Sequence, residues 1–224
     1  MIELEPLWLT FKLALFTTLI LLVLAIPLAN WLAHKKGIFK TIIEVLVSLP
    51  LVLPPSVIGF YLLLVFSPNS AIGKLLESWF DVRLVFSFEG LLIASVIYSL
   101  PFMVHPLQSG FASLPSSLRE ASFSLGKTKW QTLIKVLLPN NKPALLSALV
   151  LTFAHTVGEF GVVLMIGGNI PGKTKVASVA IYDEVESLNY HNANMYSAIL
   201  LILSFTTLFI MYLFNRRMQQ VKIL

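Results

Sequence analysis

The chain has 224 residues, of which 57% are hydrophobic and only 12% are charged, and its formal net charge is +5. Because the charged residues cluster between long apolar runs, this composition indicates an integral membrane protein, and it gives no sign of nucleic-acid binding. The absence of cysteine excludes disulfides, thiolate catalysis and cysteine metal sites.

Five apolar runs are long enough to cross a bilayer as helices. Each holds about 20 residues, which at a rise of about 1.5 Å per residue matches a hydrocarbon core of about 30 Å. The acidic start of the chain lacks the positive segment of a cleavable signal, so the first run is expected to remain as a membrane helix. We therefore predict an all-α integral membrane protein with one transmembrane domain over residues 1–224. The five expected spans are about 10–33, 42–66, 89–111, 143–168 and 195–215.

Prolines interrupt the second and third expected spans. Pro50, Pro54 and Pro55 fall within the second span, and Pro101 and Pro106 fall within the third. Proline removes a backbone donor and kinks or breaks a helix, which a membrane tolerates only where protein or a water-filled path satisfies the freed carbonyl groups. The second span is therefore predicted to line a path.

Two connections between the spans have helical patterns of their own. Residues 67–88 place apolar side chains on one helical face, which predicts a segment that lies on the membrane surface. Residues 176–187 predict a second short helix, which carries several acidic side chains. The apolar residues of the first segment are Ile72, Leu75, Leu76, Trp79 and Phe80.

The segment 114–139 is the only long polar-faced stretch between the membrane-length runs. Apolar residues recur at helical spacing on both sides of Gly126, which predicts two short amphipathic helices that meet at this glycine. Gly126 can adopt the left-handed conformation that ends a helix, and Ser117 with Glu120 fits a capping box in the first helix. The second helix is expected to have one apolar face, made by Trp130, Leu133, Ile134, Leu137 and Leu138.

Small side chains suggest what this helix pair does. Ala121 and Ser122 would let another surface approach the backbone of the first helix closely. We therefore interpret the segment 114–139 as a docking surface, with a plain pair of surface helices as the alternative interpretation.

The distribution of lysine and arginine predicts the orientation in the membrane, because these residues flank the cytoplasmic side. Eleven follow the first, third and fifth spans, and four lie in the opposite connections. The amino terminus is therefore predicted to face out and the carboxyl terminus to face the cytoplasm, which places the segment 114–139 in the cytoplasm. The eleven are Lys35, Lys36, Lys40, Arg119, Lys127, Lys129, Lys135, Lys142, Arg216, Arg217 and Lys222, and the four are Lys74, Arg83, Lys173 and Lys175.

Residues 167–174 match the phosphate-loop pattern of glycine, four residues, then Gly-Lys-Thr. The context argues against nucleotide binding, because a membrane-length run precedes the pattern where a short strand is needed, and the predicted topology places it outside the cell. We interpret it as an exposed glycine-proline turn that leads into the short helix over residues 176–187.

Glu159 lies within the fourth expected span, where an ionisable group is costly and suggests a function. His155 lies four residues earlier, on the same face of a continuous helix. The two residues can form a proton relay or a cation site. Alternatively, they form a structural pair, or Glu159 bonds to a helix break near Gly158 and Gly161.

No lysine or arginine falls in the middle of any expected span. An anion that crosses the membrane here would meet only hydroxyls, amides and helix ends, so its binding within the membrane should be weak. We therefore expect high affinity to reside in a separate protein on the outside.

Within the segment 114–139, Glu120-Ala121-Ser122 is followed at fixed distances by Gly126, Val136 and Leu138-Pro139. This spacing resembles the EAA loop of ABC importer permeases, the cytoplasmic coupling helix that sits in a cleft of the ATPase subunit. Ser122 replaces the alanine at the third position of the family pattern, and Val136 replaces isoleucine. The resemblance implies that ATPase coupling depends on Glu120, Ala121, Ser122, Gly126 and Pro139.

Three further stretches, residues 49–55, 158–161 and 168–174, are similar to signatures of oxyanion importer permeases, and most of all to molybdate permeases. The resemblance implies a type I ABC importer permease fold in the inner membrane of a prokaryote. It also implies a homodimer, two cytoplasmic ATPase subunits that use ATP and magnesium, and an external molybdate-binding protein. The predicted path or gate residues are Pro54, Pro55, His155, Gly158, Glu159 and Gly161.

Several alternatives stay open. Sulfate and tungstate permeases share much of the pattern. A secondary carrier coupled to protons or cations through His155 and Glu159 would need no ATPase and no cytoplasmic helix pair. An intramembrane enzyme lacks support, because the sequence has no recognisable nucleophile-base or metal constellation. We expect no catalytic site, cofactor or metal site in this chain.

Overall fold

The computed structural model describes residues 3–220, apart from the side chains of Leu76, Phe80 and residues 216–220. The predicted positions of Leu76 and Phe80 on the surface helix, and those of Arg216, Arg217 and Lys222, therefore lie outside the described side chains. The described chain is helical, with turns between the helices. Its helices are α1 Glu5–His34, α2 Ile38–Val52, α3 Pro55–Phe66, α4 Ala71–Phe80, α5 Phe88–Ala112, α6 Ser116–Ser124, α7 Lys129–Thr132, the π-helix η1 Leu133–Leu137, α8 Leu138–Asn140, α9 Lys142–Val157, α10 Gly161–Gly167, α11 Ala177–Glu186 and α12 Tyr190–Gln220.

Three of the five expected spans are confirmed as single long helices. Helices α1 and α5 and the part of α12 up to Asn215 are each long and apolar enough to cross a membrane. Helix α5 continues through Pro101 and Pro106 without a break. An apolar stretch of about 20 residues was therefore enough to predict these three helices from the sequence.

The second and fourth expected spans are interrupted, and the break in the second span lies at the prolines, as predicted. The stretch 42–66 is divided into α2 and α3, which meet at 114° next to Pro54. Proline at this position has no N–H to continue the helix, which explains the break. The stretch 143–168 is divided into α9 and α10 by residues 158–160.

A second sharp bend lies before the fourth expected span. The helical stretch Lys129–Asn140 meets α9 at 84°, and these two stretches together also pass for one bent span. The described part of the chain therefore has three spanning helices, or as many as five if each bent pair forms one span.

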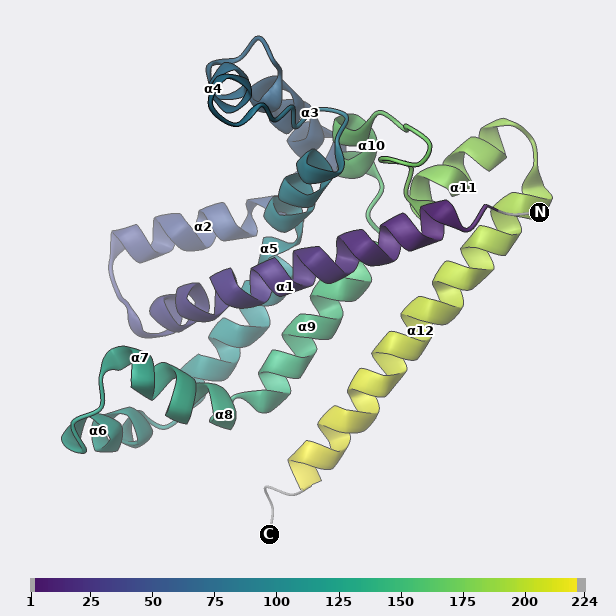
Figure 1. Cartoon of the computed structure of the whole chain (residues 1–224). Helices are drawn as coiled ribbons and strands as arrows, with labels where there is room; N and C mark the ends of the chain where they lie inside the picture. The colour runs from purple at the N-terminus through teal and green to yellow at the C-terminus, as the bar shows by residue number, and fades with distance from the viewer. Residues whose placement is uncertain (1–2, 221–224) are drawn as a thin grey trace.

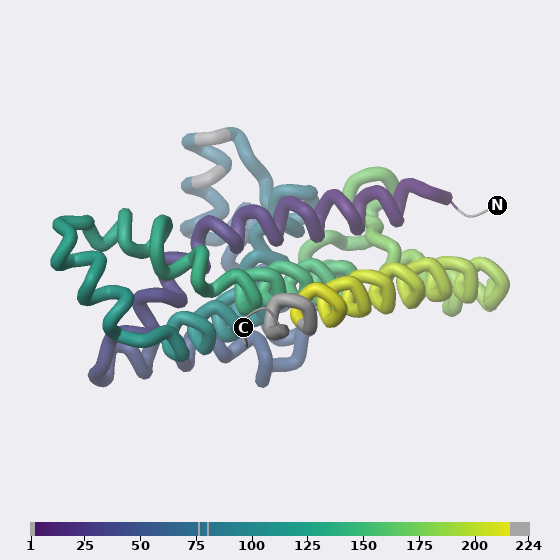
Figure 2. The backbone as a smooth tube through the Cα atoms, turned by 90° about the horizontal axis from the view of Figure 1, so that it is seen from below, coloured from purple at the N-terminus to yellow at the C-terminus, as the bar shows by residue number. Residues whose placement is uncertain are grey.

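The long helices pack side by side, and different short helices lie at the two ends of the bundle. Helix α1 packs along α5 and α9, α12 packs against α9 and α11, and α3 packs against α10. Figure 1 shows α6, α7 and α8 at one end of the molecule and α4, α10 and α11 at the other end, and Figure 2 shows the same separation of the α6–α8 region from α11. The connection 114–139 is thus a separate feature at one end of the bundle.

The two predicted helices in the connections are confirmed. The helix expected over 176–187 is α11, and the segment 67–88 contains α4, which begins after a side-chain cap by Ser70. Ile72, Leu75 and Trp79 on α4 are exposed. An exposed apolar face suits a helix at a membrane surface, and that location stays a prediction.

Candidate functional site

The helix pair in the segment 114–139 is built around a glycine turn and a cap. Gly126 has a φ of +75°, so its predicted left-handed conformation after α6 is confirmed. Thr128 then begins α7 with a capping box, because its hydroxyl accepts from the backbone N–H of Gln131 and the Gln131 side chain accepts from the Thr128 N–H. Together the turn and the cap fix the angle between α6 and α7.

The capping box predicted for Ser117 and Glu120 is wrong. Helix α6 begins at Ser116 after Pro115, and no side chain caps it. Pro115 has extended backbone angles, φ −58° and ψ 136°, so the proline ring itself helps to set the start of the helix. Glu120 is exposed on α6 and is free for another role.

Ser122 has a different place from the one expected for a docking residue. Its side chain is buried, and its hydroxyl lies 2.9 Å from the hydroxyl of Thr132, which is also buried. The bond joins α6 to α7 from the inside. Ser122 therefore stabilises the helix pair and does not offer a contact surface.

The apolar face predicted for the second helix is only partly right. Leu133 and Leu137 are buried, whereas Trp130 and Ile134 are exposed and the polar Thr132 is buried. The reason is local, because residues 133–137 form a π-helix, whose wider turn changes which side chains share a face.

The π-helix connects the helix pair to the membrane helices. Leu133 and Leu137 are each only 3% exposed, and they belong to one buried apolar cluster with Leu107 and Phe111 of α5 and Leu32 of α1. A close-packed core transmits displacement, because its side chains have little free volume to absorb it. A force applied to the helix pair therefore reaches α1 and α5.

The outer side of the helix pair, which we call the coupling surface, presents most of the residues that the EAA-loop resemblance singles out. Glu120, Ala121, Gly126 and Pro139 are all exposed. Large apolar side chains are exposed near them, and Leu125 is the most exposed at 78%. The other exposed large apolar side chains of this segment are Phe123, Trp130 and Ile134. An exposed apolar cluster within a polar segment is typical of a protein-binding site.

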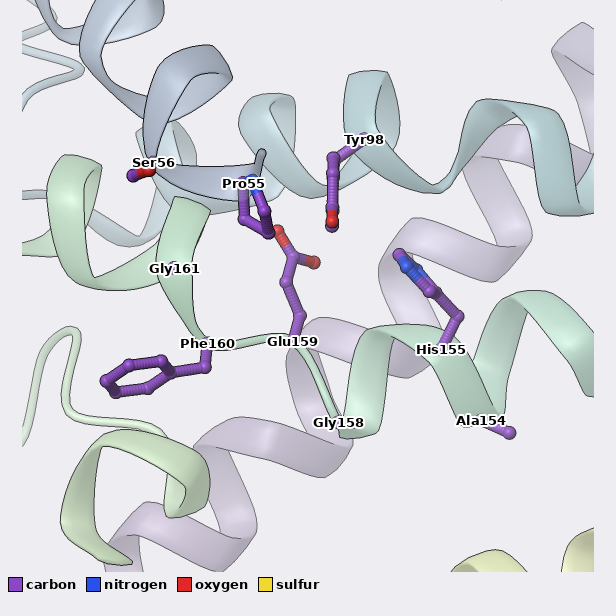
Figure 3. Close-up of a pocket in the computed structure, with 9 residues that line it drawn as sticks. All are labelled: Pro55, Ser56, Tyr98, Ala154, His155, Gly158, Glu159, Phe160 and Gly161. Atoms are coloured by element: carbon purple, nitrogen blue, oxygen red, sulfur yellow. The ribbon is translucent and has the colours of Figure 1, made fainter. Parts of the chain in front are cut away.

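A second candidate site lies where the two interrupted spans meet (Figure 3). A hollow of about 580 Å³ opens there, and its lining includes Pro55, His155, Gly158, Glu159 and Gly161. Five of the six predicted path residues are thus brought together, although residues 55 and 155 are far apart in the sequence. Pro54, the sixth, precedes Pro55 at the α2–α3 break but does not line the hollow.

Close packing holds the two breaks against each other. A Cβ atom built on Gly161 would lie 2.8 Å from the Cβ of Pro55 and 3.5 Å from the backbone N of Ser56. Since real Cβ atoms hardly ever come within 3.0 Å of another heavy atom, only glycine allows α10 to begin so close to α3. Gly158 differs, because a Cβ there would have no neighbour nearer than 3.8 Å.

Glu159 is buried in the break between α9 and α10. Its side chain is 3% exposed, and neither carboxyl oxygen has a hydrogen-bond partner among the described residues. The carboxyl group lies between Pro55 and Tyr98, and Tyr98 points its hydroxyl toward it (Figure 3). A buried polar group without a partner is uncommon in native proteins and calls for an explanation.

His155 and Glu159 do not share a helix face, contrary to the prediction. Helix α9 ends at Val157, so Glu159 has left the helix that carries His155. The imidazole stacks on Phe102 with ring centroids 3.8 Å apart. No hydrogen bond or ion pair joins His155 to Glu159 in the described chain, so the interpretation as a structural His–Glu pair is wrong.

The hydrogen bonds around His155 assign the proton on its ring. The hydroxyl of Thr156 donates to the carbonyl of Thr152, so it accepts the bond from the hydroxyl of Ser99, 2.9 Å away. The Ser99 oxygen is then free to accept from Nδ1 of His155, which lies 3.0 Å away. The neutral imidazole therefore carries its proton on Nδ1 and leaves Nε2 as an acceptor.

The phosphate-loop pattern at 167–174 forms a turn, as predicted. It follows helix α10, and Pro171, Gly172 and Lys173 are exposed. The hydroxyl of Thr174 accepts from the backbone N–H of Ile170 and donates to the carbonyl of Gly167. The threonine thus closes the loop on itself.

Several polar residues near the breaks and along α2 were not predicted as site residues. Ser56 and Tyr98 line the hollow with Glu159, although neither belongs to a sequence motif. A second polar group joins α2 to α5, where Gln108 donates to the Glu44 carboxylate and the hydroxyl of Ser48 lies 3.2 Å from Nε2 of His105. The sequence of α2 or of α5 shows that these residues are polar and lie on one helix face, but it does not show which residue of α2 bonds to which residue of α5.

Comparison with known proteins gives one family. Residues 13–220 match the family described as binding-protein-dependent transport system inner membrane component. The chain is 45% identical over 210 residues to the molybdenum transport system permease protein ModB of Azotobacter vinelandii, covering 94% of this chain and 93% of that protein. It is 38% identical over 163 residues to the probable sulfate transport system permease protein cysT of Chlorella vulgaris, covering 73% of this chain and 61% of that protein.

A solved structure shares the fold. The match is to a bacterial alginate ABC transporter in complex with an alginate pentasaccharide-bound periplasmic protein, with a TM-score of 0.75 and 17% identity. It covers 96% of this chain and 78% of that chain. The likeness shows that the two chains share their overall fold.

Proposed function

The chain belongs to the binding-protein-dependent transport system inner membrane components and has the type I ABC importer permease fold, and from this premise we propose that it is the permease subunit of a molybdate importer. The observation that supports molybdate as the substrate is the 45% identity to the molybdenum permease ModB, which extends over nearly the whole length of both chains. The permease supplies the path and has no ATPase site of its own.

The proposed partners are a second copy of this chain, two ATPase subunits and an external binding protein. Two such chains form a homodimer, and each docks one cytoplasmic ATPase subunit, where ATP and magnesium bind. The exposed Glu120, Ala121 and Gly126, with Leu125 beside them, support the docking. An external oxyanion-binding protein delivers the substrate, in line with the periplasmic protein in the alginate transporter complex.

The proposed orientation places the coupling surface in the cytoplasm. The amino terminus then faces out, the carboxyl terminus faces the cytoplasm, and five spans cross the inner membrane, two of them bent or broken. The excess of lysine and arginine beside the coupling surface supports this orientation. The position of α4, α10 and α11 at the opposite end of the bundle also supports it (Figure 1).

Transport follows from the connection between the two candidate sites. Movement of the docked ATPases displaces the helix pair, and Leu133 and Leu137 pass this displacement to α5 and α1. Helix α5 also carries Tyr98, which lines the hollow at the two breaks. The breaks act as the gate, because interrupted helices change angle more easily than continuous ones.

The alternative substrates are sulfate and tungstate. The 38% identity to a sulfate permease favours sulfate as the runner-up, but that match covers a smaller share of both chains. A proton-coupled secondary carrier has less support, because Glu159 and His155 are not bonded to each other in the described structure.

Uptake into proteoliposomes tests the proposal. The chain is reconstituted with its ATPase and external-protein partners, and uptake of molybdate, tungstate and sulfate is measured with and without ATP. We expect ATP-dependent molybdate uptake that requires both partners and that excess sulfate inhibits only weakly. Uptake of sulfate in preference to molybdate would contradict the substrate, and uptake without an ATPase would contradict the mechanism.

A further inference from the structure

The carboxyl group of Glu159 lines the hollow, and neither of its oxygens has a hydrogen-bond partner among the described residues. Both of its oxygens are buried and make no hydrogen bond, although the buried hydroxyl of Ser95 on α5 lies beside the carboxyl group and also has no partner among the described residues. The nine lining residues include no lysine or arginine. The titratable side chains that face it are Tyr98 from α5 and His155 from α9, while α3 contributes Pro55 and Ser56. No ion pair involves Glu159 in the described part of the chain.

The ionised and the neutral form of the Glu159 side chain need different neighbouring groups. An ionised carboxylate loses its hydration on burial, and only a cation or several donors could compensate for this loss. It would also repel an approaching oxyanion. A neutral carboxylic acid needs only one acceptor for its O–H, and an oxyanion offers several oxygen acceptors.

We propose that Glu159 is a neutral carboxylic acid that donates its O–H to an oxygen of the oxyanion passing through the hollow. This inference rests on the proposed function, and it identifies the hollow as a weak intramembrane station for the oxyanion. Hydrogen bonds to an ionised acceptor are roughly twice as strong as neutral ones, so one buried acid recognises an anion without a permanent positive charge. The absence of a fixed cation in the lining keeps release fast.

Neighbouring groups fit the same ligand. The hydroxyl of Tyr98 points toward the Glu159 carboxyl and is available as a second donor (Figure 3). Neutral His155 keeps its Nδ1 proton for Ser99, so it holds α9 against α5 and leaves the donor role to Glu159 and Tyr98.

A pair of variants distinguishes a neutral donor from an ion. Glu159→Gln keeps an uncharged donor of nearly the same shape, whereas Glu159→Met keeps the length and removes hydrogen bonding. In proteoliposomes with the complete complex, we expect the glutamine variant to take up molybdate within about twofold of the unsubstituted protein. The methionine variant should lose at least about tenfold, the effect of one hydrogen bond to a charged group. Glu186→Gln, which removes an exposed carboxylate on α11, serves as a control for charge alone.

A spectroscopic measurement covers the case in which the methionine variant does not assemble. Infrared difference spectra of the unsubstituted complex, recorded with and without molybdate, should show the carbonyl band of a protonated carboxylic acid shifting on binding. The band should be missing in Glu159→Gln.

Three results would overturn the inference. They are a glutamine variant that is as inactive as the methionine variant, a methionine variant that is fully active, and infrared spectra without a carboxylic-acid band that disappears in Glu159→Gln. An unsubstituted complex that moves no molybdate at all contradicts the proposed function instead, so the two failures are distinguishable.

Discussion

Gly126→Val is expected to reduce ATP-dependent uptake by more than about tenfold while the protein still inserts into the membrane. Gly126 has a φ of +75°, a conformation that costs a residue with a Cβ roughly 1–2 kcal/mol and suits β-branched residues least. A Cβ there would meet nothing within 4 Å. The substitution therefore acts on the turn between α6 and α7 and not on core packing. Uptake and membrane-inserted protein are measured on the same proteoliposomes.

The matched control is Gly126→Asn. Asparagine adopts the left-handed conformation more readily than other non-glycine residues, so the turn should survive and uptake should stay within about twofold of the unsubstituted protein. If valine and asparagine were equally inactive, the turn would not be the cause. If both were fully active, the coupling role of Gly126 would be wrong.

Gly161→Ala is expected to lower uptake by about tenfold or more, although it adds a single methyl group. That methyl would lie 2.8 Å from the Cβ of Pro55, so α10 and α3 must separate where the two breaks meet. Forcing a methyl group into a close-packed contact typically costs about 1–3 kcal/mol. Initial rates of molybdate uptake and the thermal midpoint of the purified complex are the two measurements.

Gly158→Ala provides the comparison from the same break. Its Cβ would have no neighbour nearer than 3.8 Å and its φ is −88°, which any residue adopts. Uptake should therefore stay within about twofold. Equal losses from both alanine substitutions would show that the break itself, and not the contact between Gly161 and Pro55, limits transport.

The long helices could be predicted from hydropathy because α1, α5 and α12 are each apolar over a membrane-length stretch. The break at Pro54 could also be expected, although the 114° angle could not, since it depends on how α3 packs against α10. The break over residues 158–160 contains no proline. The sequence allows a helix break near Gly158 and Gly161 as one alternative, but the apolar residues on both sides also match a continuous span, which would place His155 and Glu159 on one helix face.

The candidate sites were predictable to different degrees. The pattern over residues 114–139 predicted the exposed helix pair, whose coupling role stays a prediction, but whether Ser122 points in or out depends on the bond to Thr132, ten residues away. Glu159 was marked by the cost of a carboxyl group in a membrane span. Tyr98 carried no such signal, because only tertiary packing brings it into the lining of the hollow beside Glu159.

The central claim is that the exposed helix pair carries force from an ATPase to the gate, and cross-linking tests it most directly. The chain has no cysteine, so single substitutions are unambiguous. Ala121→Cys lies on the exposed part of α6, and Lys173→Cys lies in the exposed turn at the other end of the bundle. In the assembled complex, a short bifunctional thiol reagent should join position 121 to a cysteine in the ATPase cleft, in a yield that changes with ATP, and should not join position 173. An ATPase adduct from position 173, or none from position 121 in an active complex, would contradict the account.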